Sequence, residues 1–335
     1  MVAPLAVSIG DPAGIGAEII VESWARRRES GLAPFFAAGG ASVLQAAAEL
    51  RETDCPVVRI DDAAEAADAF AHGLPVLGAD DCGYKPGVPD DEGAALALGS
   101  LAEATRMALL GKAGAVVTAP VAKAQLARIG FEFPGQTEFL AVACGLPAEA
   151  SVMMLAGPSL RTVPVTVHCA LADVPGLLTA DMIYSRARIV AEALERDFGI
   201  ATPRLAICGL NPHAGEGGKF GSEERDIIEP AIDLMRQAGM TVSGPHPADA
   251  LFTPRARQNY DAAIAMYHDQ ALVPLKALDF DEGVNVTLGL PIVRTSPDHG
   301  TAFDIAGKGL ADPGAMIAAL RMAGEIAVRR TPSAS

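Results

Sequence analysis

Three of the six histidines follow apolar runs that are typical of buried strands. His168 follows TVPVTV, His213 follows RLAICGLNP and His268 follows DAAIAMY. In open α/β sheets the loops after the carboxyl ends of the strands converge, so we expect these imidazoles to meet. Imidazole is the commonest protein ligand of zinc and related ions, and three ligands leave a position open for catalysis. The pattern predicts a catalytic divalent-metal site, although any one histidine alone would more often be a satisfied residue in a turn.

A second group of polar residues recurs at intervals of nine residues, namely Lys276, Asn285 and Arg294. This spacing places one polar group on each of three successive short segments. An arginine and a lysine with an amide donor form a competent cradle for a phosphate or a carboxylate. Taken singly, the two basic residues would be ordinary surface charges; taken together, they predict an anionic small-molecule ligand.

Three glycine-rich segments could approach a ligand closely. The segment SIGDPAGIGAEII at 8–20 reads as a strand, a tight turn and a helix start that could offer N–H groups to an anion, but it lacks the GxGxxG fingerprint. NPHAGEGGKFG at 211–221 surrounds His213 and is typical of a lid or substrate loop. RTSPDHGTAFDIAGKG at 294–309 contains glycines where backbone could lie against a flat ligand.

The composition of the chain limits the kinds of partner that we expect it to bind. The 335 residues carry 26 basic and 41 acidic side chains, a net charge of −15 that disfavours nucleic acid and anionic membranes. The five cysteines form no CxxC pair, so we expect reduced thiols. The N-terminus has no basic region before its apolar residues, and no apolar run approaches the roughly 18 residues of a membrane span. These features predict a cytoplasmic protein.

Apolar runs bounded by glycine, proline or asparagine alternate with amphipathic stretches, which predicts an α/β fold with mostly parallel sheets. Expected strands cover 4–10, 34–38, 114–118, 151–156, 162–167, 204–210 and 261–267. Expected helices cover 14–28, 92–111, 177–197, 222–238 and 313–329. The length favours two domains, and we expect the chain to cross between them near 120 and near 295. The first domain would then comprise 1–120 with 295–335, and the second 121–294.

Seven segments, in order along almost the whole chain, resemble the 4-hydroxythreonine-4-phosphate dehydrogenase family. They are GDPAGIGAE at 10–18, TAPVAK at 118–123, PGQTEFLA at 134–141, NPHAGEGGKFG at 211–221, GPHPADALF at 244–252, YHDQALVPLK at 267–276 and RTSPDHGTAFDIAGKG at 294–309. The resemblance implies an isocitrate and isopropylmalate dehydrogenase type of fold, with two α/β domains, an interdomain cleft and a homodimer whose active site lies at the subunit interface.

The same resemblance assigns roles to residues. It implies metal ligands at His168, His213 and His268, for one zinc, magnesium or cobalt ion per site, and NAD or NADP as cofactor. Its nucleotide loop corresponds to His299, Gly300, Asp304, Gly307 and Gly309. Its substrate contacts fall on Gln136, Thr137, Lys276, Asn285 and Arg294. The family usually has GHTE where this chain has GQTE, so Gln136 keeps a hydrogen-bond donor but can carry no positive charge.

The implied reaction is the NAD(P)-dependent oxidation of 4-phosphooxy-L-threonine to 2-amino-3-oxo-4-phosphooxybutanoate. Loss of carbon dioxide then gives 3-amino-2-oxopropyl phosphate, a precursor of pyridoxal 5′-phosphate. Asp249 and Lys276 are candidates for the general base. One alternative is a related dehydrogenase of another phosphorylated sugar acid or of a cyclic dihydrodiol. Others are a metal-dependent hydrolase, because three histidines can also activate water, and a non-catalytic metabolite-binding protein.

Overall fold

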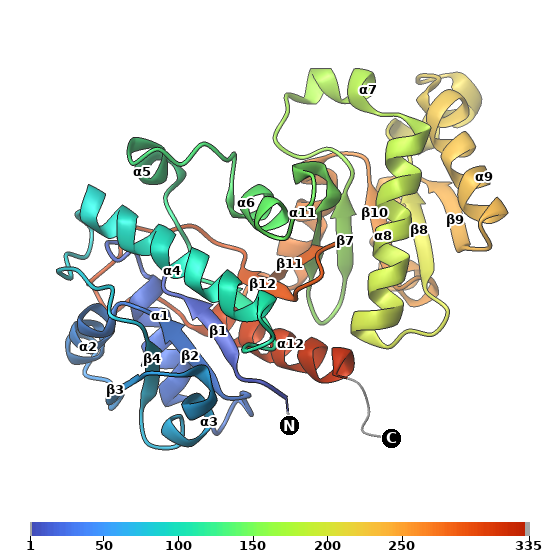
Figure 1. Cartoon of the computed structure of the whole chain (residues 1–335). Helices are drawn as coiled ribbons and strands as arrows, with labels where there is room; N and C mark the ends of the chain where they lie inside the picture. The colour runs from blue at the N-terminus through green and yellow to red at the C-terminus, as the bar shows by residue number, and fades with distance from the viewer. Residues whose placement is uncertain (1, 332–335) are drawn as a thin grey trace. The chain divides into compact units, whose positions relative to one another are not determined.

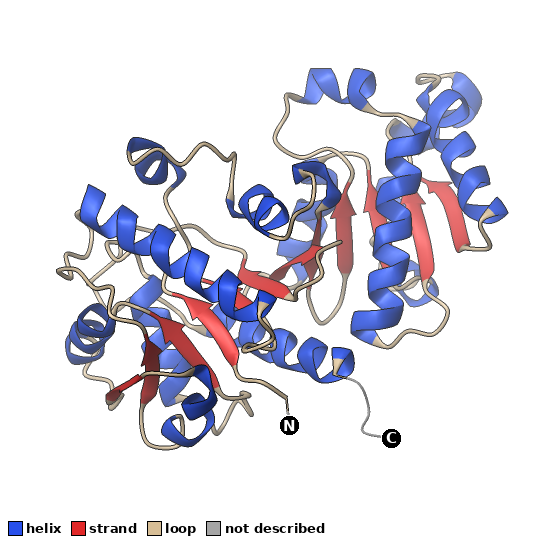
Figure 2. Cartoon of the chain, viewed as in Figure 1, coloured by secondary structure: helices blue, strands red, loops and turns tan. Residues whose placement is uncertain are grey.

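The computed structural model describes residues 2–331 of the chain, which form two compact α/β units. The first unit consists of the described residues up to Ser151 together with those from Leu290 onward. The second is Val152–Gly289. Figure 1 traces the chain through both units, and Figure 2 separates their helices from their strands.

The sheet of the first unit is parallel throughout. Its strand order is β3 (Val57–Ile60), β4 (Leu74–Leu77), β2 (Phe35–Ala38), β1 (Leu5–Ser8), β5 (Val116–Thr118) and β12 (Arg294–Pro297). Every residue of β1, β2 and β4 is buried, as expected for strands covered on both faces. The chain leaves β1 toward β2 on one side and returns to β5 on the other. The topological switch point, where α/β sheets bind ligands, therefore lies between β1 and β5.

Helices cover this sheet, and their ends follow local sequence signals. They are α1 (Gly16–Ala25), α2 (Ala41–Leu50), α3 (Ala66–Ala69), α4 (Asp91–Leu109), α5 (Lys123–Arg128), α6 (Gln136–Ala143) and α12 (Gly314–Arg330). Asp90 caps α4, because its carboxylate accepts a hydrogen bond from the Gly93 N–H at 2.8 Å. The capped helix then packs along β1 (Figure 1).

The second unit has a mixed sheet in the order β11 (Val284–Leu288), β6 (Val152–Ala156), β7 (Arg161–Pro164), β10 (Ala262–Ala265), β8 (Arg204–Cys208) and β9 (Thr241–His246). The pairs β11–β6 and β6–β7 are antiparallel. The strands β7, β10, β8 and β9 run parallel, so their carboxyl ends share one edge. The helices of this unit are α7 (Val174–Leu177), α8 (Ala180–Phe198), α9 (Glu229–Gln237), α10 (Ala248–Leu251) and α11 (His268–Leu278).

The fold confirms the mostly parallel α/β prediction, and each expected strand and long helix is present within a few residues. The expected crossing near 120 is wrong, because α5, α6 and the chain up to Ser151 belong to the first unit. Leu140 and Ala141 of α6 lie in the same buried cluster as Ala6 and Val116, which explains the difference. The second crossing falls before Leu290 rather than near 295.

The sequence alone does not predict the short strands β3, β4, β9, β11 and β12. Among the described residues, no helix combines the length and apolar character that a bilayer span requires.

Two buried polar side chains tie the carboxyl ends of β7, β10 and β8 together. The Thr166 hydroxyl, after β7, donates to the Met266 carbonyl after β10 at 2.8 Å. Gln270 accepts from the Met266 N–H at 2.6 Å and donates to the Gly209 carbonyl, after β8, at 2.8 Å. Thr166 is 6% and Gln270 8% exposed, so water cannot readily replace them. These bonds fix the loops that follow the three strands.

Replacing Gln270 tests this link. Gln270→Ala leaves the Met266 N–H and the Gly209 carbonyl buried without these partners, and we expect the free energy of unfolding to fall by about 2–4 kcal/mol. Urea denaturation followed by circular dichroism measures the change. The control is Gln237→Ala, at the exposed end of α9, which should stay within about 0.5 kcal/mol of the parent. Equal stability of both variants would contradict the proposed role of Gln270.

Candidate active site

The three predicted metal ligands follow three adjacent parallel strands. His168 comes after β7, His268 after β10 and His213 after β8, and these strands are neighbours in that order. The ring centroids of His168 and His268 are 6.1 Å apart. The loops that carry the three histidines therefore leave the sheet of the second unit at the same edge.

His213 lies on an unusual turn. Five successive residues, 213–217, have positive φ angles, and His213 itself has φ 53° and ψ 28°. Its ring faces Phe220, with the ring centroids 6.3 Å apart. Within residues 2–331, no three or more histidine, cysteine, aspartate or glutamate side chains are arranged to hold a metal ion. The structure thus pairs His168 with His268 but does not bring His213 to them as a third ligand.

Asp269 orients the ring of His268. The Nδ1 atom of His268, the first residue of α11, lies 2.7 Å from Oδ1 of Asp269. In the neutral imidazole, donation from Nδ1 leaves the Nε2 lone pair available to a cation, an arrangement common among metal-binding histidines. The donor chemistry of the region therefore fits a divalent ion, although this conformation does not assemble three ligands.

Arg294 forms a second polar centre, in the first unit. It begins β12 and is only 5% exposed, yet its Nη2 donates to Oγ1 of Thr118 at 2.7 Å and to Oε1 of Gln136 at 3.3 Å. Burial lowers the pKa of Arg294 to about 10, and the carboxylate of Glu138 acts in the opposite direction. The guanidinium stays protonated at neutral pH. It places a buried positive charge at the carboxyl end of β5, beside the switch point.

Gln136 is well suited to this neighbour. Its Oε1 accepts from Arg294, and its Nε2 donates to the Ala119 carbonyl at 3.4 Å. An uncharged amide supplies an acceptor without adding a second positive charge beside the buried guanidinium. Thr137 follows it in the first turn of α6.

The remaining predicted substrate and base residues lie in the second unit. Lys276 is exposed in the last turn of α11, and Asp249 is exposed in the first turn of α10. Asn285 lies on β11, where its Oδ1 atom is buried and makes no hydrogen bond. A buried acceptor without a partner is unusual and fits a group that binds a ligand donor.

The predicted nucleotide loop packs against the glycine-rich turn after β1. The Ile15 N–H donates to the Thr301 carbonyl at 3.0 Å, and the Gly307 N–H donates to the fully buried Glu18 at 2.7 Å. Gly307 has φ +76°, and a Cβ there would lie 2.8 Å from the Pro86 ring, so only glycine fits.

The other predicted residues of this loop are His299, Gly300, Asp304 and Gly309. Nδ1 of His299 lies 3.1 Å from the Gly300 carbonyl, and Asp304 and Gly309 lie in the exposed part of the turn. The loop exposes glycine backbone, which fits the close approach of a flat cofactor.

Sequence analysis does not single out several residues that shape these centres. Thr118 lies in the TAPVAK segment and Glu18 in GDPAGIGAE, so both are inside segments that carry the family resemblance. Asp11 is also buried after β1; burial raises its pKa, which the hydrogen bond from the Ala13 N–H opposes. A buried carboxyl at a switch point is the signal that could have identified Asp11.

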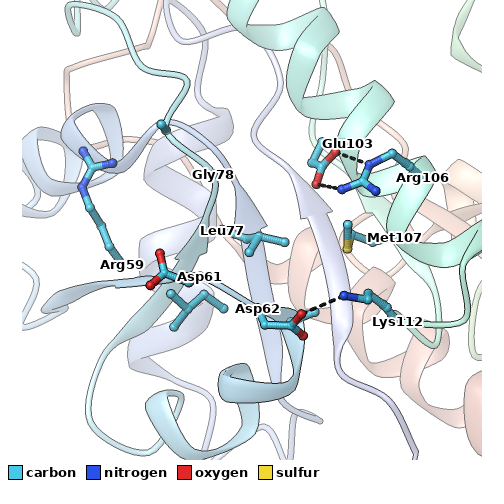
Figure 3. A pocket seen from close by; sticks show the side chains of 12 residues that line it. Arg59, Asp61, Asp62, Leu77, Gly78, Glu103, Arg106, Met107 and Lys112 are labelled. Atoms are coloured by element: carbon cyan, nitrogen blue, oxygen red, sulfur yellow. Dashed lines mark hydrogen bonds and ion pairs between the residues drawn. The ribbon is translucent and has the colours of Figure 1, made fainter.

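A cavity of about 450 Å³ lies elsewhere in the first unit, at the carboxyl ends of β3 and β4 (Figure 3). None of the predicted site residues lines it. Its three basic side chains pair with carboxylates. Arg59 pairs with Asp81 at 3.0 Å. Arg106 pairs with Glu103 at 2.8 Å and Lys112 with Asp62 at 2.7 Å (Figure 3). Because these charges are already matched, the cavity gives no indication of a particular ligand.

Known proteins are similar to this chain over nearly its whole length. Residues 32–323 match the family model described as pyridoxal phosphate biosynthetic protein PdxA. A 4-hydroxythreonine-4-phosphate dehydrogenase of Erythrobacter litoralis is 66% identical, covering 98% of this chain and 97% of its own.

Two solved structures share the fold. The 4-hydroxythreonine-4-phosphate dehydrogenase of Klebsiella pneumoniae is 38% identical, with a TM-score of 0.86 and coverage of 97% of this chain and 99% of its own. A terephthalate 1,2-cis-dihydrodiol dehydrogenase of Burkholderia xenovorans is 32% identical, with a TM-score of 0.65 and coverage of 96% and 97%. The chain therefore belongs to the family of the pyridoxal phosphate biosynthetic protein PdxA.

Proposed function

We propose that this protein is a 4-hydroxythreonine-4-phosphate dehydrogenase that uses NAD(P) and a divalent metal ion. The family membership supports the reaction, since the close relatives carry that name. The observation that carries the site assignment is the placement of three histidines after three adjacent parallel strands, with His168 and His268 already paired.

The chemistry is the oxidation of a secondary alcohol. C3 of 4-phosphooxy-L-threonine would lose a hydride, and its hydroxyl would lose a proton to a base of the protein. The resulting β-keto acid, 2-amino-3-oxo-4-phosphooxybutanoate, loses carbon dioxide to give 3-amino-2-oxopropyl phosphate. When bound, the ion would lower the pKa of the substrate hydroxyl, and the nicotinamide would accept the hydride.

Side chains of the protein would bind the ion and the substrate. His168, His213 and His268 would hold the ion, with Asp269 keeping the His268 ring oriented through Nδ1. Arg294, positioned by Thr118 and Gln136, would bind the phosphate with its buried positive charge. Thr137, Lys276 and Asn285 would add contacts to the substrate.

Asp249 or Lys276 would remove the hydroxyl proton. The glycine-rich loop from His299 to Gly309, anchored on Glu18, would bind the cofactor, either NAD or NADP.

We further propose that the protein acts as a cytoplasmic homodimer. A homodimer is the assembly that the resemblance to this family implies. The second unit also exposes apolar side chains at and after α11, with Val273 63% and Phe280 73% exposed. Exposed apolar groups of this size favour burial against another protein surface.

One alternative substrate class has a specific observation in its favour. The Burkholderia xenovorans structure shares the fold at 32% identity and is named as a cis-dihydrodiol dehydrogenase. A diol of that class carries no phosphate, so Arg294 would then have a different role. The response of the enzyme to the substrate phosphate separates the two possibilities.

Removing a metal ligand tests the site. We expect His213→Ala to lower metal-dependent turnover about 100-fold or more and to weaken binding of Zn²⁺, Mg²⁺ or Co²⁺ measured by titration calorimetry. His72→Ala, which removes an exposed imidazole in the first unit, is the control and should match the parent. Full turnover of the parent protein in excess chelator would contradict the metal assignment.

Changing Arg294 tests the phosphate contact. Arg294→Lys keeps the charge but loses the forked donors, so we expect KM for 4-phosphooxy-L-threonine to rise about 100-fold. KM for 4-hydroxy-L-threonine, which lacks the phosphate, should change little. Steady-state NADH formation measures both, with the exposed Arg329→Lys as control. An equal loss for the two substrates, or faster turnover of a cis-dihydrodiol, would contradict the phosphate role.

A further inference from the structure

One buried carboxylate in the second unit lies directly against the loop that carries His213. Glu224 is the first residue of the π-helical turn Glu224–Ile228, which leads into α9, and it is 5% exposed. Its Oε1 accepts hydrogen bonds from the backbone N–H groups of Leu210 and Asn211, both at 2.8 Å. Its Oε2 accepts from Nδ2 of Asn211 at 2.9 Å. One side chain therefore satisfies three donors of the segment that precedes His213.

The loop leaves room for this carboxylate by means of glycines. A Cβ at Gly215 would lie 2.6 Å from Oε2 of Glu224, and one at Gly209 would lie 3.1 Å from Oε1. The Cβ at Gly209 would also lie 2.9 Å from Cα of Ala214. The chain before and after His213 thus closes around Glu224, with glycine where any larger residue would displace the carboxylate.

The conformation that Glu224 supports is unfavourable by itself. His213, Ala214 and Glu216 have φ angles of 53°, 51° and 42°, in the left-handed region that residues other than glycine rarely adopt. Such a turn persists only where surrounding contacts determine it. The contacts from Glu224 are buried and hold the backbone of Leu210 and Asn211, two residues before the first left-handed residue.

We propose that Glu224 is a positioning residue that holds the left-handed turn and thereby sets the place of the His213 imidazole. The inference rests on the proposed role of His213 as a metal ligand. Glu224 does not contact the ion or the substrate in this role; it acts through the backbone of Leu210 and Asn211 and through the Asn211 amide.

The test compares two substitutions that remove the same charge. Glu224→Gln leaves one accepting oxygen where the loop uses two, so it cannot serve the backbone donors and Nδ2 of Asn211 together. Glu229→Gln, in the exposed first turn of α9, is the matched control because it removes an equal charge from the same helical segment. A long-range electrostatic effect on cation binding would appear in both variants.

Two measurements are made on the full-length proteins. Hydrogen–deuterium exchange without added metal reports protection of residues 210–217, and titration with Zn²⁺ reports affinity. For Glu224→Gln we expect faster exchange confined to this loop and an affinity for Zn²⁺ about 10-fold lower than that of the parent. Glu229→Gln should match the parent in both. Circular dichroism restricts the comparison to folded protein, and Glu224→Asp is a second variant if the first does not fold.

The outcomes separate the inference from the proposed function. If His213→Ala binds Zn²⁺ as the parent does, the metal role of His213 is wrong. If His213→Ala loses affinity while Glu224→Gln keeps that of the parent, the metal role stands and the positioning role of Glu224 is overturned. Unchanged exchange at residues 210–217 in Glu224→Gln, or equal effects in Glu229→Gln, also overturns it.

Discussion

The arrangement of the second unit depends on satisfying backbone polar groups where parallel strands end. At the carboxyl edge of β7, β10 and β8 the ladder of hydrogen bonds stops, and the N–H and carbonyl groups of the following loops need new partners. Thr166, Gln270 and Glu224 supply them from buried positions. Because these three side chains bind the backbone of the loops, the imidazoles of the histidines are not needed for that purpose. A single strand edge therefore determines both the packing and the chemistry of the region.

In the first unit the main constraint is the burial of a positively charged side chain. Arg294 is almost completely enclosed. Its guanidinium donates to a hydroxyl and to an amide oxygen, and the carboxylate of Glu138 opposes the lowering of its pKa by burial. Burying a charge is expensive, but a buried charge binds an incoming anion more strongly than an exposed charge would. Glutamine at position 136 fits this setting, because its amide leaves the local charge unchanged at any pH.

Much of the fold, and the place of the candidate histidines in it, could be predicted from the sequence. The features that could not be predicted have physical causes. His168, His213 and His268 are recognisable because a continuous apolar run predicts a buried strand, and a strand end has a defined place in the fold. The orientation of His213 could not be predicted, because its left-handed turn depends on Glu224, whose contacts come from a different element. The burial of Arg294 could not be predicted from the sequence, for a similar reason. Thr118 lies 176 residues away in the chain, and no local pattern links the two.

The assignment of α5 and α6 failed because a domain boundary is a property of packing. The segment from 121 to 151 contains no glycine-rich or serine-rich linker. The packing of α5 against α4, and the burial of Leu140 and Ala141 in one cluster with Ala6, show which unit it joins. Helix and strand signals are local, whereas the choice of partner is not.

The discontinuity of the first unit also sets an order for assembly during synthesis. Its strand β12 and its helix α12 come from the C-terminal part of the chain, and Glu18 bonds to Gly307 across 289 residues. The ribosome delivers the whole second unit before these pieces exist. The second unit can therefore close on itself while the first still lacks one strand, one helix and one of the two partners of the buried Glu18 carboxylate, the other being Arg51. The first unit contains the residues that are synthesised first, and it is the last unit to be completed.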